Sequence, residues 1–191
     1  MYIIFRMEYL DIVDENGIPT GEIVERGKAH AEGIMHRTSH VWLVRKRNGK
    51  TEILLQKRCD TKDSFPGCYD ISSAGHIPAG VEFVPSAVRE LKEELGIDVT
   101  EDELIYCGDR SVTWDAEFYG KPFHDRQFSR VFALWCDKDG SEFQLQEEEV
   151  SAVLWMELDK AITAVRENTI PNCIYVKELE MVKGKIGEGT K

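Results

Sequence analysis

The sequence lacks the features that would place the chain in a membrane, in a disulfide-rich class or on a nucleic acid. Its start, MYIIFRMEYL, has too short an apolar run for a signal peptide or a membrane span. The five cysteines are an odd number and none has C-x-x-C spacing, which indicates reduced thiols in the cytoplasm and neither a disulfide framework nor a zinc site. The net charge of −11 argues against binding a nucleic acid polymer or an anionic membrane.

What is present is the composition of a soluble globular protein. Of the 191 residues, 42% are hydrophobic and 31% are charged, and there is no internal repeat or low-complexity stretch. This length allows one full core with an appended segment. We therefore expect an N-terminal hairpin extension packed on the core over residues 1–35, a core domain over 36–168, and a C-terminal helix and tail over 169–191.

Strand and helix signals follow one another in the manner of an α+β fold. Two hairpins are predicted over residues 8–26 and 41–58, the second around the Asn48-Gly49 turn. Residues 27–35 form either a short helix or a loop. The remaining elements are long strands over 104–114 and 123–135 joined by a polar and aromatic loop, a strand over 150–158, and helices over 159–168 and 173–185 before a frayed tail.

An amphipathic acidic helix is predicted at the centre of the chain, over residues 85–95. Its apolar side chains recur at the spacing of a helix that packs on a core: Ala87, Val88, Leu91 and Leu95. Glu90, Glu93 and Glu94 fall on an adjoining stripe, where like charges one turn apart repel by roughly a few tenths of a kcal/mol per pair. This stripe is either a solvated acidic face with an Arg89–Glu93 pair, or a set of oxygen ligands that converge on a cation.

The residues around this helix favour the cation because they resemble the Nudix box, G-x5-E-x7-R-E-U-x-E-E-x-G-U, where U is aliphatic. All but one of its fixed positions match, namely Gly75, Arg89, Glu90, Leu91, Glu93, Glu94, Gly96 and Ile97. The exception is Val81, at the position of the first Glu, which in the family orients the helix Arg. The resemblance implies a Nudix-type α/β/α sandwich with a mixed sheet, to which this chain adds an N-terminal hairpin and C-terminal helices.

The resemblance also implies a divalent cation, Mg²⁺ with Mn²⁺ as an alternative, held by the carboxylates and the Gly75 carbonyl. The expected metal ligands are Gly75, Glu90, Glu93 and Glu94. Cleavage of a diphosphate linkage further requires groups that hold the phosphates. The candidates for substrate binding are Arg58, Lys62 and Arg89, although lone basic residues are more often solvated surface.

The general base is expected among the acidic residues. Glu93 and Glu94 of the box are candidates, and so is the run Glu147–Glu149, in which we select Glu148. For this run the alternative is a solvated loop that precedes a strand, because charge runs are usually solvated. The expected catalytic residues are therefore Glu93, Glu94 and Glu148.

Residues 8–160 are similar to the Nudix branch that contains type 1 isopentenyl diphosphate isomerase. The shared stretches are LDIVDENGIPTG, HAEGIMH, VWLV, LLQKR, SSAGH and a late strand that ends in LW. The isomerase has a catalytic Cys where this chain has Ala74, and a catalytic Glu where it has Gln127, with Asp125 two residues earlier. Neither Ala nor Gln transfers a proton, so hydrolase activity is favoured over isomerase activity.

Three histidines align with the ligands of the isomerase's other metal: His30, His36 and His76. Imidazoles with carboxylates suit a transition metal such as zinc. The alternative, which we favour because the carboxylate partners have changed, is that these histidines survive as hydrogen-bonded structural residues.

These observations predict a Mg²⁺-dependent Nudix-type hydrolase that acts on a nucleoside diphosphate derivative or a related small-molecule diphosphate. The alternatives are an isopentenyl-diphosphate isomerase and a non-catalytic nucleotide-sensing module. Trp114, Phe118 and Tyr119 either stack a base, cap an apolar group or pack the hairpin. We expect no partner of the nucleic acid or membrane class, and a homodimer is one expected state because family members often dimerise.

Overall fold

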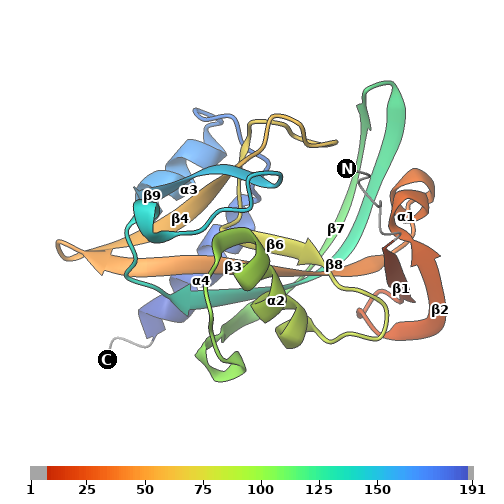
Figure 1. The fold of residues 1–191 in the computed structure, drawn as a ribbon, viewed down its shortest axis with the longest axis horizontal. Helices are drawn as coiled ribbons and strands as arrows, with labels where there is room; N and C mark the ends of the chain where they lie inside the picture. Colours follow the sequence, from red (N-terminus) through yellow and green to blue (C-terminus); the bar gives the residue numbers. More distant parts are fainter. Residues whose placement is uncertain (1–7, 189–191) are drawn as a thin grey trace.

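A computed structural model describes residues 8–188, so the expectations for the first seven residues and for residues 189–191 of the tail lie outside the described residues. Figure 1 shows the arrangement of the elements. Their bounds are β1 (Tyr9–Val13), β2 (Pro19–Glu25), α1 (Arg26–Glu32), β3 (His36–Arg47), β4 (Lys50–Arg58), β5 (Tyr69–Asp70), β6 (Ser73–His76), α2 (Phe83–Leu95), η1 (Glu101–Glu103), β7 (Ile105–Phe118), β8 (Lys121–Trp135), η2 (Gly140–Glu142), β9 (Val150–Glu157), α3 (Leu158–Arg166) and α4 (Val176–Glu188).

The centre of the fold is a seven-stranded mixed sheet with the strand order β5-β4-β3-β8-β7, in which β6 also pairs with β3 and β9 with β4. The parallel pair is β3 with β8, which runs from His36 opposite Gln127 to Val44 opposite Trp135. The neighbouring pairs are antiparallel. Strands β1 and β2 form a separate two-stranded sheet. The mixed sheet expected from the sequence is therefore confirmed.

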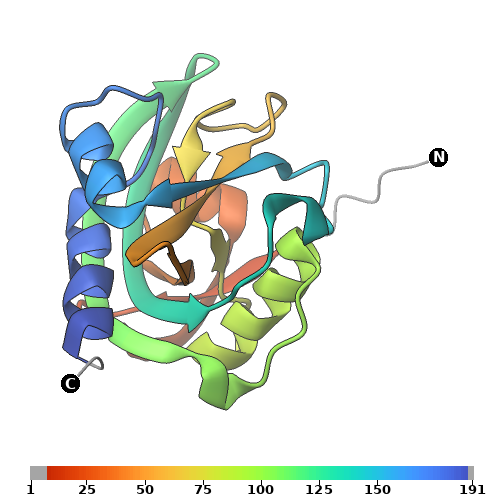
Figure 2. The ribbon, with the colours of Figure 1, turned by 90° about the vertical axis from the view of Figure 1, so that its left-hand side faces the viewer.

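Helices cover both faces of this sheet, with α2 on one side and α3 and α4 on the other (Figure 2). Alternation along β3 divides the core, because successive strand residues point to opposite faces. Val41 and Leu43 pack with the α2 side chains, whereas Trp42 and Val44 pack with those of α3 and α4. The expected α/β/α sandwich is confirmed.

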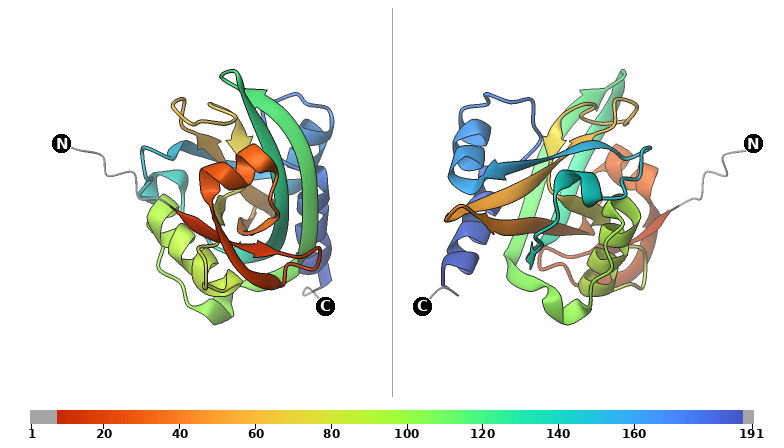
Figure 3. Two further views of the ribbon diagram at one scale, coloured as in Figure 1. Left: turned by 90° about the vertical axis from the view of Figure 1, so that its right-hand side faces the viewer. Right: turned by 60° about the vertical axis from the view of Figure 1, so that its left-hand side comes forward.

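The hairpin of β7 and β8 is longer than the sequence analysis predicted. Residues expected to form a loop continue the strands as far as Phe118 and Lys121, and the turn is only Tyr119-Gly120, both with positive φ (51° and 74°). Such a two-residue turn matches the twist of paired strands, and cross-strand pairing continues to the tip. The hairpin consequently extends beyond the rest of the sheet (Figures 1 and 3).

Strand β3 also begins earlier than predicted, at His36 in place of residue 41. Its first half pairs on both sides, with Thr38 opposite His76 of β6 and opposite Ser129 of β8. This strand is buried on both faces, so it lacks the alternation that reveals a half-exposed strand. The missed part places His36 beside His76.

Helix α2 confirms the predicted acidic helix. Ala87, Leu91 and Leu95 are buried on the core, and Gly96 ends the helix in the left-handed conformation with φ 68°. In the described part of the chain, no helix is long and apolar enough to cross a membrane.

Candidate active site

The acidic side of α2 packs directly against the end of β6. A Cβ atom on Gly75 would lie 2.2 Å from Cδ of Glu90, far closer than two carbon atoms approach, so only glycine allows this contact. Glu94, one turn further along α2, accepts a hydrogen bond from the backbone N–H of Ala74 at 3.2 Å. The sheet backbone and two of the predicted carboxylates therefore meet at one place.

Burial changes the ionisation of both carboxylates. It raises the pKa of Glu94 to about 8, with a further contribution from Glu90, and it raises the pKa of Glu90 to about 7 against the opposing effect of Arg89. Two buried acids of this kind are held ionised only if positive charge approaches them. A hard divalent cation with oxygen ligands fits this pair and the adjoining Gly75 backbone.

Glu93 is exposed and bound to Arg89, whereas Glu94 is buried. The Arg89 guanidinium donates to Glu90 at 2.5 Å and to Glu93 at 3.0 Å, and the side chain of Glu93 is 51% exposed. Arg89, which the sequence analysis proposed for substrate binding, thus fixes the box carboxylates from within the helix. The Val81 carbonyl instead accepts a hydrogen bond from Arg37 at 2.8 Å.

Of the acidic run before β9, Glu149 is the residue that faces the site. Its carboxylate forms an ion pair with Lys62, and its charge is near enough to raise the pKa values of Glu90 and Glu94. Glu148 is exposed on the turn. The structure thus groups Lys62 and Glu149 with the box residues and does not bring Glu148 to them. The backbone explains this, because the Glu149 carbonyl accepts from the Cys59 N–H at 2.9 Å.

Arg58 holds a loop. Its Nε and Nη2 donate to the Ser64 carbonyl at 3.1 and 2.9 Å, and its Nη1 donates to Asp70 at 2.9 Å. The guanidinium therefore fixes residues 59–68, the loop that carries Lys62. These partners take up Nε–H, one N–H of Nη1 and one N–H of Nη2, and phosphate binding by Arg58 stays a prediction.

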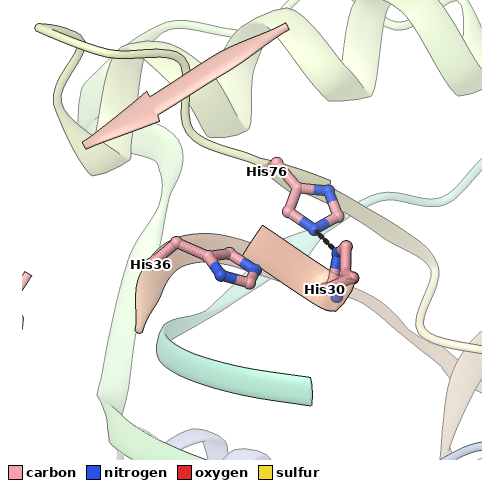
Figure 4. A group of neighbouring side chains, drawn as sticks. All are labelled: His30, His36 and His76. Atoms are coloured by element: carbon pink, nitrogen blue, oxygen red, sulfur yellow. Dashed lines mark hydrogen bonds between the residues drawn. The ribbon is translucent and has the colours of Figure 1, made fainter. Parts of the chain in front are cut away.

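A second group of side chains lies on the opposite side of β6 from Glu94. His30 of α1, His36 of β3 and His76 of β6 point toward one another, and one ring nitrogen from each lies within 4.8 Å of the other two (Figure 4). The Nε2 atoms of His30 and His76 lie 3.0 Å apart, and the Ile34 carbonyl is 2.8 Å from Nδ1 of His36. Within residues 8–188, the other nitrogens of His30 and His36 are buried without a hydrogen-bond partner.

The Asp125 carboxylate lies beside the histidine cluster. Its Oδ1 lies 3.9 Å from Nδ1 of His30 and is itself buried without a partner among the described residues. Burial lowers the pKa of His30 to about 3 and of His36 to about 4, so both imidazoles are neutral and offer a lone pair. Hydrogen bonds inside the cluster thus satisfy only part of it, and three neutral imidazoles fit a transition metal such as zinc.

Two positions that separate the chain from the isomerase lie nearby. Ala74 packs in the core on the α3 and α4 side, and Gln127 accepts from the Thr38 hydroxyl at 3.4 Å. Neither side chain is an acid.

Comparisons with known proteins identify the family of the chain. A family model described as the NUDIX domain matches residues 36–173. An uncharacterized Nudix hydrolase of Clostridium acetobutylicum is 38% identical over 153 residues, which cover 80% of this chain and 71% of that protein.

Solved structures show the same fold. A protein of Deinococcus radiodurans superimposes with a TM-score of 0.65 at 18% identity, covering 91% of this chain and 98% of that one. The NUDIX domain of Shewanella oneidensis NrtR, complexed with ADP ribose, gives a TM-score of 0.57 at 14% identity and covers 78% of this chain and 87% of that one. The NUDIX family model matches most of the chain, and the Clostridium acetobutylicum hydrolase is 38% identical to it. The chain therefore belongs to the Nudix hydrolase family.

Proposed function

We propose that this hydrolase cleaves a diphosphate linkage in a nucleoside diphosphate derivative or a related small molecule, with Mg²⁺ as its cation and Mn²⁺ as an alternative. The observation that carries the proposal is the meeting of Gly75, Glu90 and Glu94 at one point, with Lys62 and Glu149 facing them. Oxygen ligands for a metal ion, a carboxylate that can accept a proton and a lysine that can bind phosphate are thus gathered in one place.

Glu90, Glu93 and Glu94, with the Gly75 carbonyl, would hold the cation, while Arg89 keeps Glu90 and Glu93 in position. A bound divalent cation neutralises charge that develops on the phosphate oxygens. Glu149 accepts a proton from the attacking water, a new P–O bond forms, and the bridging P–O bond breaks with its electron pair leaving on the departing group. Lys62 exchanges its ion pair with Glu149 for a phosphate oxygen, which frees the Glu149 carboxylate to act as the base.

We also propose a transition metal at the histidine cluster, held by His30, His36 and His76, with the Asp125 carboxylate beside Nδ1 of His30. Support comes from the unpartnered buried atoms of His30, His36 and Asp125. Metal analysis of the purified protein is expected to find zinc or a similar ion that is lost in the His36→Ala variant. Binding of Mg²⁺ at the box carboxylates should be unchanged in that variant. Retention of the ion in that variant would contradict this assignment.

Product analysis tests the proposed hydrolysis. The purified protein is incubated with Mg²⁺ and a panel of nucleoside di- and triphosphates, dinucleotide polyphosphates, ADP-ribose, coenzyme A and isopentenyl diphosphate. We expect phosphate or nucleotide products that disappear in the Glu93→Gln/Glu94→Gln double variant. Conversion of isopentenyl diphosphate to its isomer would overturn the assignment, and so would undiminished turnover in the double variant.

The location and assembly of the protein are further parts of the proposal. We propose a cytoplasmic enzyme, in line with five cysteines that are all free thiols in the structure, and a small-molecule diphosphate as its partner. A homodimer is proposed on the basis of family resemblance alone.

A further inference from the structure

Four large aromatic side chains lie together outside the three buried hydrophobic clusters of the described residues: Phe65, Trp114, Phe118 and Phe123, here called the aromatic wall. Phe65 stacks on Trp114 with centroids 5.2 Å apart and an interplanar angle of 28°, and Phe123 stacks on His30 at 4.4 Å. The wall joins the loop 59–68 to the long hairpin, which lie side by side in both views (Figures 1 and 3). Each of the four rings is only partly buried.

Phe65 occupies its place at the expense of backbone strain. Its φ is +48°, in the left-handed region that bulky residues avoid, and such residues persist only where their surroundings hold them. Here the holding groups are Arg58, which donates twice to the carbonyl of Ser64, and Cys68, whose N–H donates to the Phe65 carbonyl at 3.3 Å. An anchored, strained aromatic residue at a partly exposed surface indicates a binding position.

The same loop carries Lys62, whose ammonium faces Glu149 beside the box carboxylates. Lys62 and Phe65 are three positions apart, so their Cα atoms are separated by at most about 11 Å even in a fully extended chain. One short loop, fixed by Arg58, thus presents a cation toward the proposed phosphate site and an aromatic face toward the hairpin.

We propose that the aromatic wall binds the nucleobase of the substrate while Lys62 holds its phosphates. This inference rests on the proposed function and names the part of the substrate that the loop recognises. Phe65 and Trp114 cover one face of each other, so a base would stack on a face that this pair leaves partly exposed. An aromatic face favours a planar ring, because aromatic groups stack in offset parallel geometry whereas an alkyl chain gains nothing from ring alignment.

Calorimetric binding of ADP, inorganic pyrophosphate and isopentenyl diphosphate tests the proposal in the full-length Glu149→Gln protein with Mg²⁺, which lacks the proposed base and keeps Lys62 and the cation ligands. Phe65→Gly suits the left-handed backbone and removes only the ring. With Trp114→Leu as the second variant, we expect ADP binding to weaken about tenfold in each, since base stacking on an aromatic side chain has this magnitude. Pyrophosphate and isopentenyl diphosphate should bind as in the parent.

Three variants serve as controls. Phe65→Tyr and Trp114→Phe keep an aromatic face and should retain ADP affinity, which separates loss of stacking from loss of folding. Tyr119→Ala changes the exposed hairpin tip and should have no effect. The inference would be overturned if Phe65→Gly and Trp114→Leu weakened the binding of pyrophosphate or of isopentenyl diphosphate as much as the binding of ADP. It would also be overturned if the parent did not bind ADP. Because binding is measured, absence of turnover in the product panel would refute the proposed function and leave this result standing.

Discussion

At the scale of single residues, the candidate active site depends on the absence of a side chain as much as on its carboxylates. Gly75 has an ordinary extended backbone, so its requirement is steric: the space of its Cβ is filled by Glu90. The requirement for glycine at this position follows from the packing of α2 on β6.

Gly75→Ala is expected to lower kcat/KM and the apparent Mg²⁺ affinity by about 10- to 100-fold, as for other changes that displace a metal ligand. The physical reason is that the new methyl group forces the Glu90 carboxylate away from the backbone. Gly184→Ala is the matched control, since nothing lies within 4 Å of its added Cβ. Steady-state kinetics over a Mg²⁺ titration measures both effects, and equal behaviour of the two variants would contradict the account.

Glu149 and Glu148 are neighbours with different surroundings, which makes them a sharp test of the base. Glu149→Gln should lower kcat by about 10²- to 10⁴-fold, the usual contribution of a general base. Glu148→Gln should leave kcat within about twofold, because Glu148 is exposed on the turn. A reversed order of the two variants would restore Glu148 as the base.

At the scale of elements, α4 is fixed to the sheet by one fully buried carboxylate. Glu178 accepts from Nε of Arg110 at 2.8 Å and from Trp42 at 3.1 Å, and it pairs with His40 at 3.0 Å. Burial alone would raise the pKa of Glu178, but His40, Arg110 and Trp42 overcome it and hold the pKa at about 2. Arg110 also lies over the Tyr175 ring at 4.1 Å, just before α4 begins.

This arrangement predicts an acid-sensitive contribution to stability. The pKa of Glu178 is depressed in the folded state, so its stabilisation is present above its ordinary value of 4.5 and is lost as pH falls from there toward about 2. Glu178→Gln should lower the free energy of unfolding by about 3–5 kcal/mol at neutral pH, because it breaks a buried ion pair. Urea denaturation at several pH values should show this difference shrinking below pH 4.5; a constant difference would contradict it.

The sequence predicted the elements whose signals are local. The acidic helix is fixed by its apolar spacing and Gly96, and the proposed metal-binding carboxylates follow from it. The sequence did not predict the start of β3 or the tip of β7 and β8, because these depend on pairing with strands distant in the chain. The role of Arg58 could not be predicted either, since its partners Ser64 and Asp70 become adjacent only when the loop folds back.

At the scale of the whole molecule, a protein with a net charge of −11 brings the carboxylates of Glu90 and Glu94 together beside β6. A cation bound there stabilises the folded state by mass action, by about 2.7 kcal/mol when free Mg²⁺ is a hundredfold above Kd. For a chain of this size that corresponds to a rise in Tm of about 5–10 °C. Calorimetry with Mg²⁺ and with EDTA should show this rise in the wild type and a smaller one in Glu94→Gln; an equal rise in both would place the ion elsewhere.

The most direct test of the central claim is turnover in water enriched in the heavy oxygen isotope, with the substrate that the product panel ranks first. Hydrolysis at the box predicts that a single heavy oxygen appears in one phosphate product per turnover. The incorporation should vanish in the Glu93→Gln/Glu94→Gln variant. A product without heavy oxygen, or undiminished incorporation in that variant, would contradict metal-dependent hydrolysis at Glu90, Glu93 and Glu94.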